Sequence, residues 1–267
     1  MELSPVQCFQ DLYAFSQAYR SGRWVFRGVS RTDFDLRPKL GRAGIETRSE
    51  RRMFEFFCRD SILHVPDLPS SNDWELLALA QHHGLPTRLL DWTENPLVAA
   101  YFACWSDFTW DGAIYVAQVR DEERSSQDSP FAIKEVRRFR PQCITRRIAA
   151  QRGLFTVHPN PATPLDLGDH GVIIVRRAVV PAQVKTKLLW NLSRYEINQR
   201  SLFPDLDGLC AHITWMFSGD DPSEEEYAPD TFRHSKAHQR HRVKVRSVIH
   251  GSTLPGDQIE SRRDGRQ

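Results

Sequence analysis

Asp91, Trp92 and Thr93 place a carboxylate, an indole and a hydroxyl side by side, directly after the apolar pair at 89–90. A carboxylate is rarely buried without a partner, so we expect Asp91 to hold an arginine or to cap the helix that follows. An indole can stack on a flat ligand, although for Trp92 taken alone core packing is the better interpretation. Thr93 is expected to cap the next helix. The three residues mark a rigid corner between a strand and a helix, where ligand-facing groups can be held.

Arg27 and Gly28, at the end of an early strand, form a second candidate site. The planar guanidinium of Arg27 can hold a phosphate or a carboxylate, and a structural ion pair is the plainer alternative. Gly28 allows a turn or a close approach of a ligand to the backbone. A third candidate is Gln151, whose amide can bond to a ribose hydroxyl but cannot act as an acid or a base. Its alternative role is that of a helix C-terminal residue that bonds to its own turn.

Hydrophobic periodicity and turn residues predict the elements that must position these candidates. Helices are expected at about 4–21, 47–63, 72–83, 93–105, 142–152, 181–195 and 204–217, and strands at about 23–28, 86–92, 112–119, 134–139, 154–158 and 171–180. Thr47 with Glu50 has the spacing of a capping box, and Asn72 is placed to cap the third helix. The segment 29–46 is expected to be a loop. Helices and strands follow one another without regular alternation, which indicates an α+β fold.

The chain has 267 residues, enough for one large domain or two small ones. We expect residues 1–217 to form a single domain, because the apolar periodicity continues to that point. Residues 218–267 are first acidic and then basic, with few large apolar side chains. Such a composition cannot offset the entropy of ordering, so we expect a disordered charged tail.

The net charge is +2, so no global field points to nucleic acid or to a membrane. No apolar run approaches the ~18 residues that span a bilayer, and the N-terminus lacks the features of a signal peptide, so we expect a cytoplasmic protein without a membrane partner. The five cysteines lie far apart at positions 8, 58, 104, 143 and 210, which argues against a zinc site or a redox pair. We expect no bound metal, and we expect Cys8, Cys58, Cys104 and Cys210 to be buried free thiols.

Four blocks of sequence carry a family resemblance: "WVFRG", "LLALAQHHGLPTRLLDWTENPLVAAYFA", "RRIAAQRGLFTVH" and "LFPDLDGL". In this order, from about Arg23 to about Leu209, they resemble the FRG domain, a bacterial family named for its Phe-Arg-Gly motif. More distantly, the order of elements is similar to the ADP-ribosyltransferase fold, including the DarT-like toxins. This second resemblance implies mixed sheets with surrounding helices.

The transferase resemblance implies a role for each candidate residue. Arg27 matches the arginine that grips NAD, and residues 91–93 with the following "VAAYFA" match a polar strand end and its helix. Gln151 lies nearest to a third position that usually holds a glutamate. Glutamine keeps the hydrogen bond of that glutamate but loses its charge, and removing such an electrostatic group costs about 10²–10³ in rate. Asp91 and Glu196 are the carboxylates that could serve instead.

On this resemblance, the catalytic residues would be Arg27, Asp91 and Gln151, and the residues that bind the ligand would be Arg27, Gly28, His82, Arg88, Trp92 and Thr93. NAD is the implied substrate. Trp92 would stack on the nicotinamide or on a base. Arg27, His82 and Arg88 would supply positive charge and hydrogen-bond donors to the pyrophosphate.

Two functions therefore compete. The first, which we favour, is an NAD-dependent ADP-ribosyltransferase or NAD glycohydrolase of the toxin or phage-defence type, with a nucleic acid or a protein as target. The second is a non-catalytic module that binds a nucleotide or nucleic acid, which the missing glutamate favours. The arginine-rich third block, with Arg146, Arg147 and Arg152, suits either function. A third possibility is an accessory protein whose tail recruits a partner, and no pattern indicates the oligomeric state.

Overall fold

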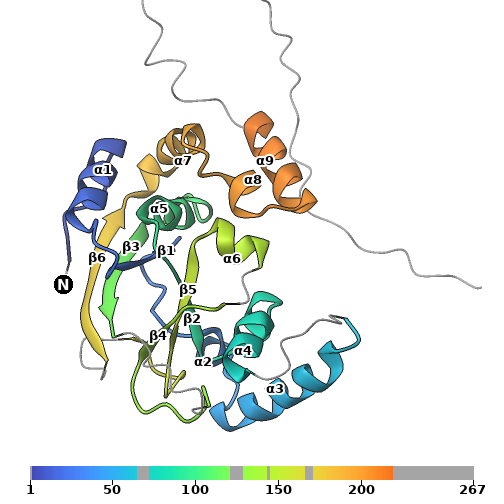
Figure 1. The fold of residues 1–267 in the computed structure, drawn as a ribbon. Helices are drawn as coiled ribbons and strands as arrows, with labels where there is room; N and C mark the ends of the chain where they lie inside the picture. Colours follow the sequence, from blue (N-terminus) through green and yellow to red (C-terminus); the bar gives the residue numbers. More distant parts are fainter. Residues whose placement is uncertain (1, 65–71, 121–128, 143–144, 166–170, 219–267) are drawn as a thin grey trace, which may run out of the picture. The chain divides into compact units, whose positions relative to one another are not determined.

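The computed structural model describes residues 2–64, 72–120, 129–142, 145–165 and 171–218 (Figure 1). The chain divides into two units, and all the described residues belong to the first, which ends at Tyr227. The expected disordered tail lies outside the described residues except for Ser218, and so does Cys143.

One six-stranded sheet forms the centre of this unit, with the strand order β4-β5-β2-β1-β3-β6. The strands are β1 (Val25–Val29), β2 (Leu89–Thr93), β3 (Gly112–Val119), β4 (Arg137–Phe139), β5 (Gly153–Val157) and β6 (Val172–Val180). The α+β class is confirmed. The expected mixed sheets are wrong, since the described strands form a single sheet in which every neighbouring pair is antiparallel. Strand direction is decided by pairing between distant segments, which local periodicity does not encode.

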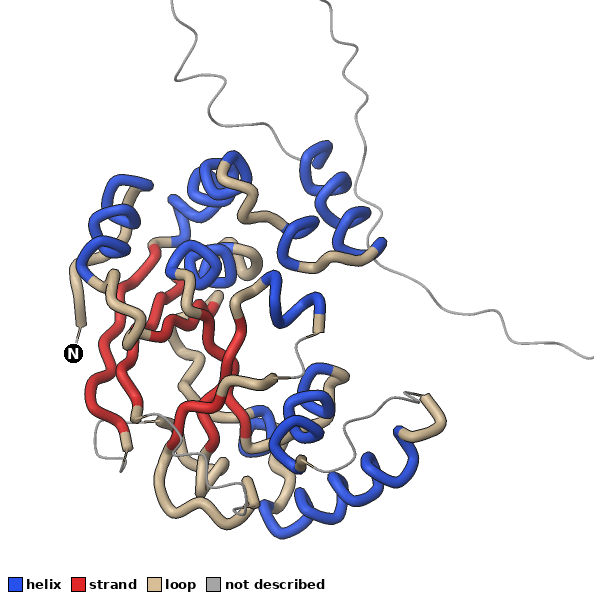
Figure 2. Tube along the Cα trace, in the orientation of Figure 1, coloured by secondary structure: helices blue, strands red, loops and turns tan. Residues whose placement is uncertain are grey.

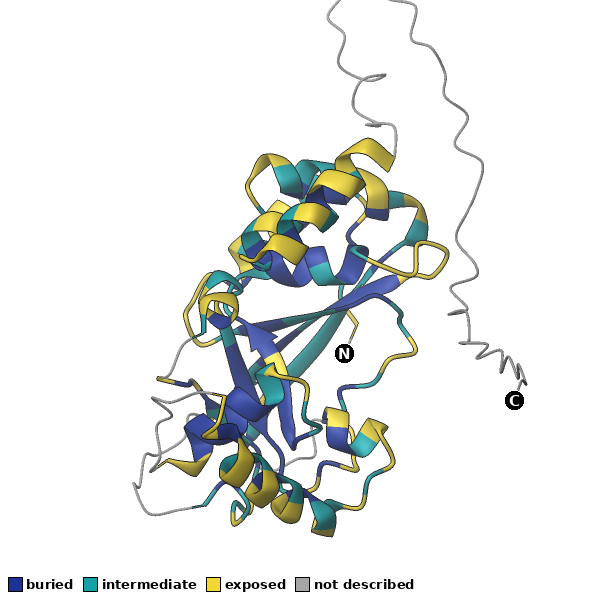
Figure 3. Cartoon of the chain, turned by 90° about the vertical axis from the view of Figure 1, so that its right-hand side faces the viewer, coloured by how far each residue is buried: buried dark blue, intermediate teal, exposed yellow. Residues whose placement is uncertain are grey.

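Helices lie in two groups beside the sheet, as Figure 2 shows. They are α1 (Phe9–Ala18), α2 (Lys39–Arg42), α3 (Thr47–Ser61), α4 (Asp73–His82), α5 (Pro96–Cys104), α6 (Arg146–Ala150), α7 (Lys185–Arg194), α8 (Gln199–Leu202) and α9 (Leu206–Ser218), with a short 3-10 turn at Ala182–Val184. The helices α1, α5 and α7 share one apolar cluster with β1, β3 and β6, whereas α3 and α4 pack with β2, β4 and β5. In Figure 3 the inner strands are largely buried, and most of the surrounding helices expose one side. Among the described residues, none of the helices has both the length and the hydropathy that crossing a bilayer requires.

Gly28 lies where the backbone of α5 crosses β1. A Cβ atom at this position would stand 1.8 Å from the carbonyl oxygen of Ala99 and 2.6 Å from the backbone nitrogen of Ala103. Only glycine lets the helix approach so closely. The backbone that comes close to Gly28 is therefore that of α5, which is apolar on nearly all sides and buried as a result, and the expected approach of a ligand to Gly28 stays a prediction.

Two expected helix caps differ from the structure. Thr93 belongs to β2, and the cap of α5 is Asn95, whose side chain accepts a hydrogen bond from the backbone nitrogen of Leu97. Glu50 does not close a capping box, because its carboxylate is buried and turned toward Arg88. For Glu50 a tertiary partner outcompetes the local one, whereas at α5 a residue two positions later in the chain takes the cap.

One helix cap, the cysteines and the segment 29–46 complete the comparison with the sequence-based expectations. Asn72 caps α4 as predicted, accepting from the backbone nitrogen of Trp74. Of the four described cysteines, all free, only Cys104 is fully buried, and Cys210 is exposed. The predicted loop at 29–46 contains the four-residue helix α2, which is too short to show periodicity.

Candidate functional site

A cleft of about 420 Å³ opens among β1, β2, β5 and the helices α2, α4, α5 and α6. Its charged side chains are those of Arg27, Lys39, Arg42, Arg147 and Asp91. Its other polar side chains are those of Gln81, His82, Thr93 and Gln151, beside an apolar wall of Phe26, Phe102, Ile148 and Phe155. Four cations thus face one carboxylate. Such an excess of positive charge in a concave site favours anionic ligands.

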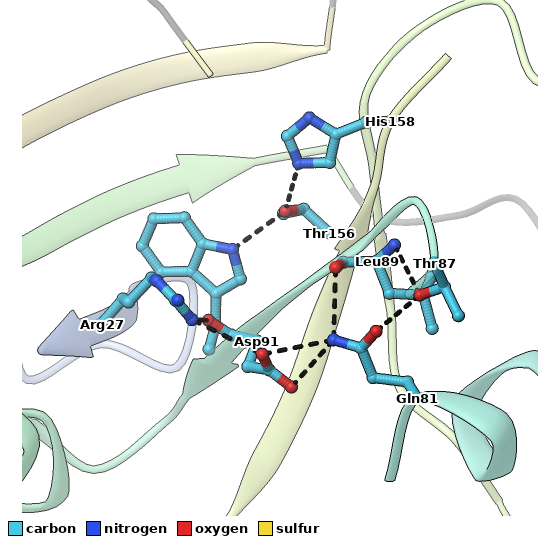
Figure 4. A network of polar contacts seen from close by, with 8 residues as sticks. Arg27, Gln81, Thr87, Leu89, Asp91, Thr156 and His158 are labelled. Carbon is cyan, nitrogen blue, oxygen red and sulfur yellow. Dashed lines mark hydrogen bonds and ion pairs between the residues drawn. The ribbon is translucent and has the colours of Figure 1, made fainter. Parts of the chain in front are cut away.

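Arg27 fills a gap between two strands. β1 and β3 are paired at five positions, but β1 and β2 are paired at one, Phe26 with Thr93. Beyond that pair, the Nη1 atom of Arg27 donates to the backbone carbonyl of Asp91 at 2.7 Å and lies 3.6 Å from its carboxylate (Figure 4). The guanidinium therefore supplies a hydrogen bond that the strand ladder omits, and the expectation that Asp91 holds an arginine is confirmed.

Like charges repel one another inside this cleft. Burial lowers the pKa of Arg27, and the charge of Arg42 lowers it further, while the Asp91 carboxylate acts in the opposite direction. Burial also lowers the pKa of His82, with smaller contributions from His83 and Arg147. The Nε atom of Arg27 is buried and has no hydrogen-bond partner in the described structure. Four cations beside a single carboxylate leave an excess of positive charge in the cleft, which is the electrostatic condition of an anion site.

Asp91 is held by a short relay of hydrogen bonds. The Nε2 atom of Gln81 lies 3.3 Å from each of the two carboxylate oxygens. The hydroxyl of Thr87 donates to the Oε1 atom of Gln81 at 2.6 Å and accepts from the backbone nitrogen of Leu89 at 3.1 Å (Figure 4). Because the hydroxyl proton is committed to Oε1, the amide nitrogen of Gln81 must face Asp91. The carboxylate is 58% exposed, so the relay orients it without covering it.

Trp92 lines the cleft, but its indole lies in the core and is 3% exposed. Its Nε1 atom donates to the Thr156 hydroxyl at 2.9 Å, and the same hydroxyl lies 2.9 Å from the Nε2 atom of His158 (Figure 4). Burial lowers the pKa of His158 to about 3, and Arg27 and Arg88 add to this effect, so the ring is neutral at ordinary pH. The indole is thus committed to a buried network, in line with the core-packing interpretation, and its stacking on a ligand stays a prediction.

Arg88 does not line the cleft. Its guanidinium is buried against the Glu50 carboxylate at 2.8 Å and lies over the ring of Phe131. The backbone nitrogen of Arg88 donates to the same carboxylate at 2.7 Å. In this conformation Arg88 ties α3 to the start of β2, and its expected contact with pyrophosphate stays a prediction.

Gln151 and Thr93 meet at the opposite edge of the cleft. The Thr93 hydroxyl donates to the backbone carbonyl of Gln151 at 2.7 Å, and the Nε2 atom of Gln151 donates to the carbonyl of Leu202 at 3.1 Å. Gln151 is also the C-cap residue of α6, in line with its alternative role. Its Oε1 atom is the group still available to a ligand.

Asp91 is the single carboxylate that lines the cleft among the described residues. The other candidate, Glu196, lies at the turn after α7, pairs with Arg200 at 3.0 Å and does not reach the cleft. Of the three arginines in the arginine-rich block, only Arg147 lines the cleft, and its guanidinium lies 4.4 Å from the centre of the Phe203 ring.

Lys39, Arg42 and Gln81 were missed by the sequence analysis. Lys39 and Arg42 come from the segment expected to be a loop, and the Nζ atom of Lys39 donates to the carbonyl of Gly84 at 2.7 Å. The signal that could have found them is a basic pair three residues apart after Pro38, which is well placed to start a helical turn. Within the described ranges, no group of His, Cys, Asp or Glu side chains is arranged to hold a metal ion.

Comparison with known proteins identifies one family. Residues 22–111 match the FRG domain, and this matched range supplies Arg27, Lys39, Arg42 and Asp91 to the cleft. Arg147 and the rest of the α6 wall follow the matched range. No curated protein matches the chain, and no solved structure matches it either. The ADP-ribosyltransferase resemblance gains no support from these comparisons and stays a prediction.

Proposed function

We propose that this FRG domain binds a phosphate-bearing nucleotide in the cleft. The observation that carries the proposal is the gathering of four cations around one carboxylate, from elements that are far apart in the sequence. The Arg42 side chain is exposed and makes no hydrogen bond or ion pair within the described structure, so it is free to meet a ligand. Guanidinium groups match phosphate oxygens in geometry as well as in charge.

The shape of the cleft suits a nucleotide better than a free inorganic anion. Its volume of about 420 Å³ lies within the usual range for small-molecule sites. The apolar wall contributed by Phe102 and Ile148 gives a base or sugar a surface, while the cations meet the phosphates. A bare anion would leave that wall facing water.

Calorimetric titration with ADP and with NAD tests this proposal. Arg147→Gln should weaken binding about tenfold, because a hydrogen bond between charged groups is lost. Arg146→Gln is the matched control, since Arg146 is the exposed neighbour on the same helix and does not line the cleft. Raising the salt concentration should weaken binding to the wild type more than to Arg147→Gln. Equal loss in the two variants, or no binding of either nucleotide at millimolar concentration, would overturn the proposal.

A second candidate function is cleavage of NAD, by transfer of ADP-ribose or by hydrolysis. It is favoured by the position of Asp91, an exposed carboxylate held by Arg27 and Gln81. The bond from ribose C1′ to the nicotinamide nitrogen would break, neutral nicotinamide would leave, and water or a target nucleophile would attack C1′. A carboxylate beside the ring stabilises the positive charge that develops there.

Nicotinamide release from NAD by the purified protein tests the second candidate. The wild type should release nicotinamide, and Asp91→Asn should release at least about 10²-fold less. Gln151→Glu should not raise the rate, because the new carboxylate would face the carbonyl that the Gln151 amide now contacts. Binding of NAD without release would leave the chain as a non-catalytic nucleotide-binding module.

A further inference from the structure

A carboxylate in a site for phosphates is a disadvantage unless it meets a donor on the ligand. Asp91 repels every phosphate that the four cations attract, since like charges in a cleft oppose binding. It is nevertheless held in place by Gln81 and Arg27 rather than left to turn away. We infer that Asp91 recognises the vicinal hydroxyls of a ribose, so that the cleft selects ribonucleotides with a free 2′,3′-diol. This inference rests on the proposed nucleotide binding.

The geometry leaves one side of the carboxylate open. The Nε2 atom of Gln81 lies 3.3 Å from each carboxylate oxygen of Asp91, and the Nη1 atom of Arg27 lies 3.6 Å from one of them. An ionised carboxylate has about four lone-pair sites and accepts hydrogen bonds only. The Arg27 contact at 3.6 Å is too long for a hydrogen bond, so Gln81 alone occupies a lone pair on each oxygen, and the second lone pair of each stays available on a side chain that is 58% exposed. Two acceptors side by side match two neighbouring hydroxyl donors.

The relay behind Asp91 makes this acceptor rigid. Leu89 donates to Thr87, and Thr87 donates to Gln81, so the Gln81 amide cannot turn its oxygen toward the carboxylate without losing a 2.6 Å hydrogen bond (Figure 4). A group fixed before binding loses little conformational entropy when the ligand arrives. The ligand must then present phosphates to the cations and hydroxyl donors to Asp91. A ribonucleotide presents both hydroxyls, whereas a 2′-deoxyribonucleotide keeps only one of them and pyrophosphate has none.

Three probes and two variants test the inference, with affinities measured by calorimetry at fixed salt. The wild type should bind ADP at least about tenfold more tightly than it binds 2′-deoxy-ADP, because the deoxynucleotide loses a hydrogen bond to a charged group. Asp91→Asn should bind both at similar, weakened affinity. It should bind pyrophosphate more tightly than the wild type does, since the repelling charge is gone. The shortest contact of Arg27 is with the backbone carbonyl of residue 91, which this substitution retains.

Glu196→Gln is the control, because it removes an exposed carboxylate that does not line the cleft. It should preserve the preference for ADP. Equal wild-type affinity for ADP and 2′-deoxy-ADP would overturn the ribose inference and leave nucleotide binding intact. Tighter binding of ADP by Asp91→Asn would overturn it as well, since the carboxylate would then only repel. If none of the three probes binds, the proposed function is overturned and this inference falls with it.

Discussion

Removing one partner of the ion pair between Glu50 and Arg88 should be among the most destabilising single substitutions in this domain. The two side chains are 1% and 6% exposed, and Glu50 accepts from both the guanidinium and the backbone nitrogen of Arg88. Glu50→Gln leaves the Arg88 charge buried with no carboxylate beside it. Breaking a buried pair in this way costs about 3–5 kcal/mol. At about 2–4 °C per kcal/mol for a chain of this size, Tm should fall by about 6–20 °C.

The matched control lies on the same helix. Glu55 pairs with Arg51 at 3.3 Å, but both side chains are more than half exposed. Glu55→Gln should cost only about 0.3–0.5 kcal/mol, because water screens an exposed pair. Thermal unfolding followed by circular dichroism measures both variants under the same conditions. Equal shifts in Tm for the two substitutions would refute the reasoning from burial.

A double variant separates this structural role from ligand binding. Glu50→Leu with Arg88→Met removes both charges and keeps apolar volume, so most of the stability should return. Nucleotide affinity should stay within about twofold of the wild type, since neither residue lines the cleft. A tenfold loss of affinity in the folded double variant would show that Arg88 does contact the ligand, as the sequence analysis had predicted.

Three further predictions follow from the cleft and its supports. Gly28→Ala should lower Tm strongly, because its Cβ would stand 1.8 Å from an α5 carbonyl oxygen. Gly22→Ala should leave Tm nearly unchanged, because nothing lies within 4 Å of the new Cβ, and thermal unfolding curves compare the two variants. Arg27→Lys should weaken nucleotide binding and also lower Tm, since lysine cannot reproduce the fork that bridges β1 and β2; an unchanged Tm would contradict the bridging role. Burial lowers the pKa of His82 in the free protein, and a bound anion would raise it, so affinity for NAD should increase as pH falls toward 5. Binding titrations from pH 8 to 5 should show this rise in the wild type and a flatter profile in His82→Gln.

The sequence by itself determined the kinds of elements and several of the residues that meet in the cleft. Asn72 and Gly84 bracket α4 because capping and helix termination are local effects. Arg27, Asp91 and Gln151 could be singled out because polar side chains at the ends of apolar runs stand out without knowledge of the fold. The α+β class likewise follows from the order of periodic segments.

Only the tertiary structure decided which of these side chains meet the cleft. Arg88 has Glu50 as its partner, 38 residues earlier in the chain, and the Trp92 indole has the Thr156 hydroxyl, 64 residues later. Arg42 and Arg147 come together from helices too short for their pattern to be read in the sequence. The physical reason is the same in each case: burial and pairing depend on distances between segments that are remote in sequence, whereas periodicity and capping depend only on neighbours.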